Sequence, residues 1–376
     1  MEENKQLSQE EQINEAIANL DAKNFGIYFF TLDTKGNPTA GVANIYEHVK
    51  VLTKLGYQAH ILHEKNDYRI HANEHGAGIV DWLGEEYGEL SHVSIENQKL
   101  NISAKDILVI PEVFANLMEQ CKAFPCKKVV LSQSYDYILE ILPLGASWSN
   151  YGFNDVITTS QKQADYIKGL FPTINTHIIP ISIPSYFKPT DEIKKPIISI
   201  FTREQKEAVK LVKSFYLQYP TYKWVTFREL RGLSRKEFAN SLGESCLSVW
   251  VDPISSLGTF PLESIECETP TIGLMPNMVP EWMESEPQKD GTILLKNNGV
   301  WTNNIMGIPD LIAQFLKVWL EDTVPVDLTN TILASKGKFS EEAQEAKINQ
   351  VFTTLVSNRK LELAALIPAA ELQVEK

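Results

Sequence analysis

Residues 247–274 of the 376-residue chain read LSVWVDPISSLGTFPLESIECETPTIGL. The apolar and β-branched runs at 247–251 and 271–274 predict two strands, and the segment 262–267 between them predicts a short helix. A loop rich in glycine and serine joins the first strand to this helix. A strand, a helix and a second strand in this order form the unit from which parallel α/β sheets are built.

The same alternation continues on both sides of this stretch. Upstream of it, strands are predicted at 197–201 and 224–227 and helices at 204–217 and 234–242, the latter starting at a Ser234/Glu237 capping box. The first half of the chain predicts a helix at 42–55 and strands at 26–31, 58–62, 106–110, 128–131 and 155–158. Buried strands that alternate with amphipathic helices predict an α/β fold whose parallel sheets are covered on both faces.

A proline-rich segment at 180–196 separates the two halves. It holds four prolines with charged residues between them, which is typical of a stiff and extended connector. We therefore predict a polar lead at 1–24, a first α/β domain at 25–185 and a second α/β domain at 190–338. A last helical segment is predicted at 340–372.

The composition is that of a folded protein, with 43% hydrophobic and 22% charged residues. The 35 basic and 48 acidic residues give a net charge of −13, so nucleic acid and anionic membranes are not expected as partners. No stretch approaches the ~20 apolar residues of a membrane span, and the amino terminus shows no signal peptide. The four cysteines form neither a disulfide framework nor a CxxC metal site, so the expected setting is the cytoplasm.

Candidate binding residues should lie in the loops that follow strands, because ligands of parallel sheets bind beyond the carboxyl ends of the strands. The loop at 33–41 ends in Gly41, where the backbone can approach a ligand and the next helix N-terminus favours an anion. An ordinary flexible turn is the alternative interpretation of this loop.

A second loop places two cations, Arg203 and Lys206, at a predicted helix N-terminus, which suits a diphosphate. The alternative is that both side chains cover a solvated helix face. Local charge favours the anion site: residues 191–240 hold 11 basic and 6 acidic residues, whereas residues 251–300 hold 2 basic and 8 acidic residues.

The third loop leads into the helix that carries Glu263 near its start. A carboxylate in this position can balance the helix dipole. It can also accept hydrogen bonds from a ribose diol, as acidic residues do in nucleotide sites. The sequence leaves both interpretations open.

Several motifs of other enzyme classes are missing from the sequence. There is no Walker A, DxD, HExxH or GxSxG motif and no His/Cys cluster, which disfavours kinases, metalloenzymes and hydrolases. His60 and His63 lie at a predicted strand end and are interpreted as structural residues.

The stretch quoted first resembles the carboxyl-terminal signature of a glycosyltransferase family. The family pattern is roughly E-G-F-G-x-P-x-L-E-A-M-A-C-G-T-P-V-I, and this chain has Gly258, Pro261-Leu-Glu263, Cys267 and Thr269-Pro270 in register. The family is the GT4-like, or group 1, branch of the retaining GT-B glycosyltransferases. Further matches follow in the expected order along the chain, at Gly41, Ile110-Pro-Glu112, Val130-Leu-Ser-Gln133, Arg203, Lys206 and Pro280-Glu281-Trp282.

This resemblance implies a GT-B fold, in which two Rossmann-like α/β/α domains face each other across a cleft. Domain 25–185 would bind the acceptor, a glycan or another molecule, with helix 340–372 packed back on it. Domain 190–338 would bind a nucleoside diphosphate sugar, and no metal or other cofactor is expected.

The resemblance also assigns roles to individual residues. Arg203 and Lys206 would hold the donor diphosphate, and Glu263 would contact the ribose; these three are the implied catalytic residues. Substrate contacts are implied at Gly41, Glu112, Gln133, Ser255, Gly258, Thr259, Phe260 and Leu262.

Two positions depart from the family pattern. Ser255 stands where the first glutamate of the E-x7-E pair is expected, near the donor sugar, and Glu268 replaces a glycine. Either the donor sugar differs, with Ser255 or Glu266 taking over, or catalysis is weak or lost. The second case predicts a protein that binds a nucleotide or glycan and supports a partner enzyme. A nucleotide-sugar epimerase is a third alternative.

Overall fold

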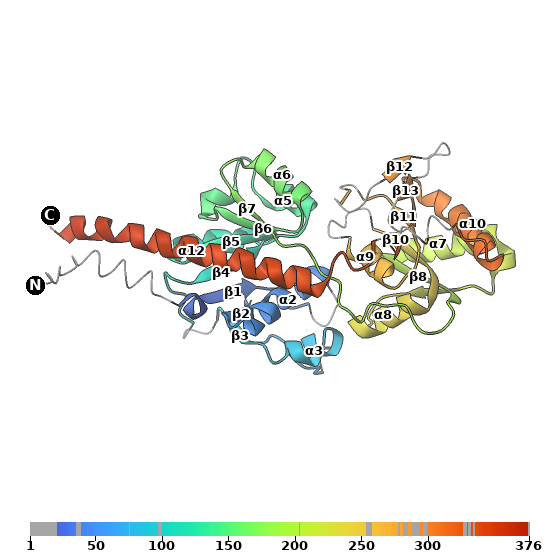
Figure 1. Cartoon of the computed structure of the whole chain (residues 1–376), viewed down its shortest axis with the longest axis horizontal. Helices are drawn as coiled ribbons and strands as arrows, with labels where there is room; N and C mark the ends of the chain where they lie inside the picture. Colours follow the sequence, from blue (N-terminus) through green and yellow to red (C-terminus); the bar gives the residue numbers. More distant parts are fainter. Residues whose placement is uncertain are drawn as a thin grey trace, which may run out of the picture.

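The computed structural model describes residues 21–34, 39–74, 76–96, 100–202, 204–252, 258–276, 279–280, 285–287, 293–295, 299–325, 329, 332–333 and 335–374. Two α/β units lie next to each other, and the long helix α12 (Glu341–Val374) runs along the first of them (Figure 1). None of the helices in these residues is long and apolar enough to cross a membrane.

The first unit is built on a parallel sheet with the strand order β3-β2-β1-β4-β5-β6-β7. Its strands are β1 (Gly26–Phe30), β2 (Gln58–His63), β3 (His92–Ser94), β4 (Ile107–Pro111), β5 (Lys127–Ser132), β6 (Asp155–Thr158) and β7 (Asn175–Ile178). Its helices are α2 (Ala40–Lys54), α3 (Ile79–Trp82), α4 (Ala115–Gln120), α5 (Tyr135–Ile141) and α6 (Gln161–Leu170), with short 3-10 turns η1 (Ala22–Asn24), η2 (Glu85–Tyr87), η3 (Cys121–Ala123) and η4 (Trp148–Tyr151).

The second unit has the strand order β12-β13-β14-β11-β10-β8-β9. Strands β8 (Lys195–Thr202), β9 (Thr226–Glu229), β10 (Ser245–Val251), β11 (Thr271–Leu274) and β14 (Gly299–Thr302) are parallel, while β12 (Ser285–Pro287) and β13 (Ile293–Leu295) add an antiparallel edge. The helices are α7 (Gln205–Gln218), α8 (Arg235–Glu244), α9 (Thr259–Glu266) and α10 (Ile308–Leu320), with η5 (Pro220–Tyr222) and η6 (Ile305–Gly307).

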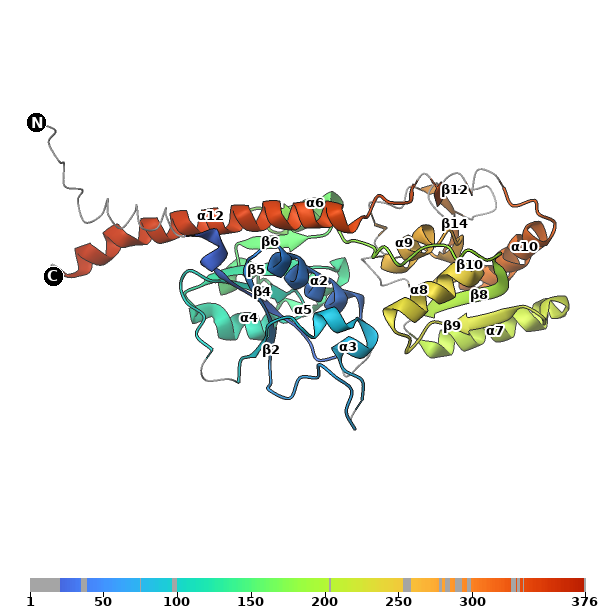
Figure 2. The same ribbon diagram turned by 60° about the horizontal axis from the view of Figure 1, so that its bottom comes forward.

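The predicted α/β fold with two parallel sheets is confirmed. Its physical basis is visible in β1, where Ile27 and Phe29 pack into the core on one face and Phe30 packs into the core on the other. A strand that is apolar on both faces can be buried only between two layers of helices. Figure 2 shows helices on both sides of each sheet.

Some predicted boundaries were wrong, and some strands were not predicted. The strand expected at 224–227 forms at Thr226–Glu229, because Trp224, which is half-exposed, and Val225 belong to the turn after η5. Strands β3, β7, β12, β13 and β14 were missed, and the antiparallel edge was not foreseen. These strands are short, and β3 and β7 carry polar or partly exposed residues at the margin of the sheet, so they lack the apolar run that identifies a central strand.

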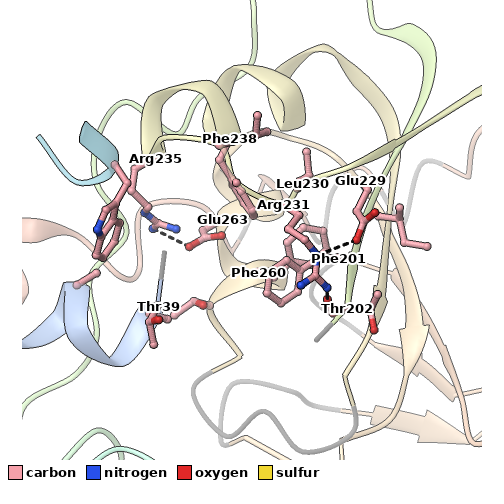
Figure 3. A pocket seen from close by; sticks show the side chains of 17 residues that line it. Thr39, Phe201, Thr202, Glu229, Leu230, Arg231, Arg235, Phe238, Phe260 and Glu263 are labelled. Atoms are coloured by element: carbon pink, nitrogen blue, oxygen red, sulfur yellow. Dashed lines mark hydrogen bonds and ion pairs between the residues drawn. The ribbon is translucent and has the colours of Figure 1, made fainter. Parts of the chain in front are cut away.

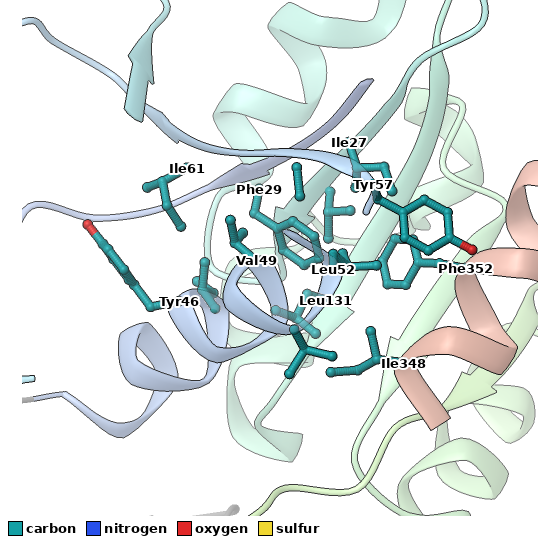
Figure 4. Close-up of a cluster of buried hydrophobic side chains, with 14 of the residues drawn as sticks. Ile27, Phe29, Tyr46, Val49, Leu52, Tyr57, Ile61, Leu131, Ile348 and Phe352 are labelled. Carbon is teal, nitrogen blue, oxygen red and sulfur yellow. The ribbon is translucent and has the colours of Figure 1, made fainter. Parts of the chain in front are cut away.

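Helix α12 packs on the first unit rather than on the second. Ile348, Phe352 and Leu355 are fully buried in the same core as Phe29, whose ring centroid lies 5.8 Å from that of Phe352 (Figure 4). Further along α12, Arg359 donates hydrogen bonds to the backbone oxygens of Ala104 and Pro125. The carboxyl-terminal segment therefore completes the core of the amino-terminal unit.

Glu268 adopts a left-handed backbone conformation, with φ of 52°, directly after α9. This conformation is unfavourable for residues other than glycine, and the half-exposed ion pair with Lys336 contributes little by comparison. Glu268→Gly is expected to be more stable than Glu268→Ala by about 1 kcal/mol in urea unfolding, because both variants lack the ion pair and only glycine relieves the backbone. Equal stability of the two variants would contradict this account.

Candidate active site

A cavity of about 290 Å³ lies between the two units, beyond the carboxyl ends of β8 and β9 (Figure 3). The first unit contributes residues from the start of α2 and the end of α3: Thr39, Ala40, Ala43 and Trp82. The second unit contributes Ile200, Phe201, Thr202, Glu229, Leu230, Arg231, Gly232, Leu233, Arg235, Phe238, Thr259, Phe260 and Glu263. This is the edge at which open parallel sheets bind their ligands.

Glu263 is the buried anion of this cavity. It lies in α9, and Arg235 Nη2 donates a hydrogen bond to its Oε1 at 2.8 Å. The two side chains are 2% and 16% exposed, respectively. A buried carboxylate needs such a cation because burial without one would be costly.

Arg235 is a cavity residue that the sequence interpretation did not single out. It is the first residue of α8, directly after the N-cap Ser234, and the predicted capping box between Ser234 and Glu237 is confirmed. The only signal for Arg235 in the sequence was its place between Ser234 and Glu237 of the capping box, within the basic stretch 191–240. Nothing in the sequence indicated that its side chain would reach α9.

An aromatic wall lies beside this ion pair. The rings of Phe201 and Phe260 are stacked with centroids 5.4 Å apart, and Phe238 meets Phe260 edge to face at 6.0 Å. The apolar surface lowers the local dielectric and strengthens electrostatic interactions in the cavity.

The predicted residues around Glu263 take different places. Thr259 and Phe260 line the cavity, and Gly258 forms the N-cap of α9 with φ of 60°, a conformation that favours glycine. This cap lets α9 begin at Thr259, three residues before the predicted start. Leu262 lies in the hydrophobic core under the helix and is not among the residues that line the cavity.

The structure describes one of the two residues predicted to hold the diphosphate. Arg203 lies outside the described residues, as does Ser255 on the predicted sugar side, so the roles of both stay predictions. Lys206 is exposed in the first turn of α7 and is not among the cavity-lining residues. Arg231, which was not predicted, lines the cavity, pairs with Glu229 at 3.0 Å and donates a hydrogen bond to the backbone oxygen of Thr202.

Gly41, Glu112 and Gln133 come together in the first unit; none of the three lines the main cavity, although Ala40, next to Gly41, does. Oε1 of Glu112 accepts hydrogen bonds from the backbone N–H groups of Gln133 and Ser134, and Oε1 of Gln133 accepts one from Asn44. A Cβ atom on Gly41 would lie only 3.3 Å from Gln133 Nε2, so a glycine allows α2 to approach this amide closely.

Burial raises the pKa of Glu112 to about 7, and the hydrogen bonds from backbone N–H groups offset this effect only in part. Folded Glu112 therefore keeps its proton up to about pH 7, while the unfolded chain loses it near the ordinary value of 4.5. The unfolded state ionises first as pH rises, so this residue lowers stability progressively between those two values.

Glu112→Gln should remove this pH dependence. Relative to the wild type, the free energy of unfolding of the variant should rise by roughly 2 kcal/mol between pH 5 and pH 8, measured by urea denaturation at both values. The matched control is Glu119→Gln at an exposed position of α4, whose curve should run parallel to that of the wild type. If the free energy of unfolding of Glu112→Gln differed from that of the wild type by the same amount at both pH values, the raised pKa of Glu112 would be refuted.

The two histidines of β2, His60 and His63, contact neighbouring side chains of the first unit, which agrees with their interpretation as structural residues. His60 stacks on Tyr28 and contacts Ser91, while His63 stacks on Tyr68 and hydrogen bonds to His92. All four cysteines are buried and free. Across the described part of the chain, no group of three or more His, Cys, Asp or Glu side chains is arranged to hold a metal ion.

Comparison with known proteins gives relatives of one enzyme class. No family model matches the chain. An alpha-1,6-glucosyltransferase of Actinobacillus pleuropneumoniae serotype 7 is 26% identical over 233 residues, which cover 60% of this chain and 66% of that protein. The chain is thus similar to about two thirds of the length of this relative.

Solved structures with the same fold cover nearly the whole chain. Sucrose-phosphate synthase from Thermosynechococcus elongatus superposes with a TM-score of 0.59 at 12% identity, over 89% of this chain and 100% of that one. A pneumococcal O-GlcNAc transferase, solved with UDP and GlcNAc, superposes with a TM-score of 0.61 at 9% identity, over 88% and 99% of the two chains. The chain therefore shares the GT-B fold of these solved structures and is similar in sequence to a named glucosyltransferase, in keeping with the resemblance around Glu263.

Proposed function

We propose that this protein transfers a hexosyl group from a nucleoside diphosphate sugar to a hydroxyl group of an acceptor. The observation that carries the proposal is the position of Glu263. It lies in the second turn of α9, lines a cavity between two α/β units, and belongs to the motif that resembles the ribose-binding segment of GT4-like enzymes. The second unit would bind the donor and the first the acceptor.

The chemical requirement is stabilisation of charge on the departing diphosphate. The bond between the anomeric carbon and the diphosphate oxygen breaks, a bond to the acceptor oxygen forms, and the acceptor hydroxyl loses its proton. Arg203 and Lys206, together with the N-terminus of α9 after Gly258, would stabilise the diphosphate electrostatically. In this scheme no metal ion is needed, and the anomeric configuration is retained, as in the family that the motif resembles.

UDP-glucose is the first donor to test. The relative from Actinobacillus is named a glucosyltransferase, and the pneumococcal enzyme was solved with UDP. A glucoside or another glycan is the first acceptor class to test, because the name of that relative, alpha-1,6-glucosyltransferase, specifies a 1,6 linkage. Ser255, in place of the usual glutamate, favours a second candidate function, namely binding of the nucleotide sugar without turnover.

The experiment is a panel of UDP-, GDP- and ADP-sugars, each incubated with the protein in the presence and absence of simple glucosides. Release of the nucleoside diphosphate that depends on the acceptor would support the transferase. Saturable binding without release, seen as a thermal shift, would favour the non-catalytic binder. Absence of both binding and release across the panel would overturn the proposed function.

A further inference from the structure

We propose that Arg235 is a positioning residue that aims the carboxylate of Glu263 at the donor ribose and ties it to the segment linking the two units. The inference rests on the proposed function, because it concerns how the same cavity recognises a nucleotide. It adds a residue that the motif around Glu263 does not contain.

The first support is the geometry of the ion pair. Arg235 Nη2 binds Oε1 of Glu263 at 2.8 Å, and Figure 3 shows both side chains at the cavity. An ionised carboxylate has about four acceptor positions on two oxygens, so one bond to Arg235 leaves capacity for ribose hydroxyls. A charge-assisted bond of this kind fixes the orientation of the carboxylate before a ligand arrives.

The second support is that Arg235 is itself held in place. Its guanidinium carbon lies 4.9 Å from the ring centroid of Phe187 and 5.8 Å from that of Phe238. The guanidinium also lies beside the phenol of Tyr186, where burial raises the pKa of that phenol and the positive charge of Arg235 offsets this larger effect in part. A planar guanidinium carries several N–H donors in fixed directions and stacks on aromatic rings, so it can contact all of these partners at once. The ammonium group of a lysine lacks this planar arrangement of donors.

The third support is where these partners come from. Tyr186 and Phe187 belong to the proline-rich segment between β7 and β8, which links the two units. Tyr186 and Arg235 also line a small cavity of about 40 Å³ together with Asn44, Glu47 and Tyr87 of the first unit. Arg235 therefore contacts the donor-side carboxylate on one side and the interdomain link on the other.

A purely structural ion pair is the competing explanation. Buried ion pairs often serve packing, and removing one partner then destabilises the protein without a specific effect on any ligand. The two explanations differ in ligand chemistry. A positioning role makes the effect of Arg235 depend on the ribose hydroxyls, whereas a structural role does not.

The test measures binding of UDP, GDP and ADP, and of their 2′,3′-dideoxy counterparts, by isothermal titration calorimetry. The wild type should prefer the ribonucleotide by about 10-fold or more, as expected for hydrogen bonds to a charged group. Arg235→Met should lose about 10-fold affinity for the ribonucleotide and almost none for the dideoxy form. Lys236→Met, at the exposed neighbouring position of α8, is the matched control and should bind like the wild type.

A double-mutant cycle with Glu263→Gln adds a second readout. If Arg235 acts through Glu263, Arg235→Met should have little further effect on nucleotide affinity in the Glu263→Gln background. Arg235→Lys keeps the positive charge and should retain the fold with intermediate preference for the ribonucleotide, which keeps the test valid if the methionine variant unfolds.

The possible outcomes separate this inference from the proposed function. Equal loss of both nucleotide forms, no loss, or additive effects in the cycle would overturn the positioning role while the proposed function stands. A wild-type protein that binds none of the diphosphates would overturn the proposed function itself.

Discussion

Arg203→Ala is expected to slow sugar transfer about 30- to 1000-fold in kcat/KM for the donor. The resemblance places this guanidinium on the donor diphosphate, where charge develops as the bond to the sugar breaks. Removing one preorganised donor of this kind typically costs about 2 to 4 kcal/mol of transition-state stabilisation. The rate is measured as release of nucleoside diphosphate with the donor and acceptor identified in the panel.

The matched control for this variant is Lys213→Ala, which removes an exposed cation from α7 without approaching the cavity. Its activity should equal that of the wild type. Near-normal transfer by Arg203→Ala would eliminate the assigned role of Arg203 and leave Arg231, which lines the cavity and pairs with Glu229 rather than with Glu263, as the next candidate for the diphosphate contact.

Phe352→Ala should lower the free energy of unfolding of the first unit by about 3 to 5 kcal/mol. Phe352 is fully buried and packs against Phe29, so truncation removes a large apolar contact and leaves a cavity between α12 and the sheet. Urea denaturation gives the size of the loss, and amide hydrogen exchange should localise it to β1 and α2.

The control for Phe352→Ala is Thr354→Ala, at an exposed position two residues further along α12. Its stability should stay within about 0.5 kcal/mol of the wild type. If Phe352→Ala changed hydrogen exchange in the second sheet and not in the first, the packing of α12 on the first unit would be refuted.

Hydrogen bonds at the start of α12 connect the helix to the neighbourhood of the cavity. Helix α12 starts at the interdomain side, where Gln344 Nε2 donates to the backbone oxygen of Pro180 and contacts Asn44. Asn44 in turn donates to Gln133, beside Glu112. Helix α12 therefore holds the proline-rich link and the start of α2 in one hydrogen-bonded arrangement next to the cavity.

Much of this architecture could be predicted from local sequence. Central strands such as β1 and β10 are apolar on both faces, and such runs between amphipathic helices have one stable solution, a parallel sheet inside two helical layers. The short strands at the sheet margins could not be found in this way. Residues such as those of β3 and β7 become strands only because a neighbouring strand supplies hydrogen-bonding partners, and a single sequence does not reveal that partner.

In the candidate site, too, residues close to each other in the sequence could be predicted, whereas contacts between distant residues could not. The resemblance around Glu263 implied substrate contacts at Thr259 and Phe260, which line the cavity, because these residues are neighbours of Glu263 along the chain. The predicted helix start missed the start of α9 by three residues. Arg235 could not be predicted, since it reaches Glu263 across 28 positions through the packing of α8 beside α9. Lys206 was predicted from charge at a helix start, but which way an exposed side chain faces depends on the whole surface.

The sequence by itself determined the two α/β units, their order and the segment that resembles a ribose-binding motif, because periodicity and turn residues are properties of short stretches. Only the tertiary structure decided which side chains meet. It paired Arg235 with Glu263, placed Leu262 in the core, and packed Phe352 of α12 against Phe29. The physical reason is that ion pairs and buried contacts depend on distances between elements, and those distances are set by packing of the folded chain as a whole.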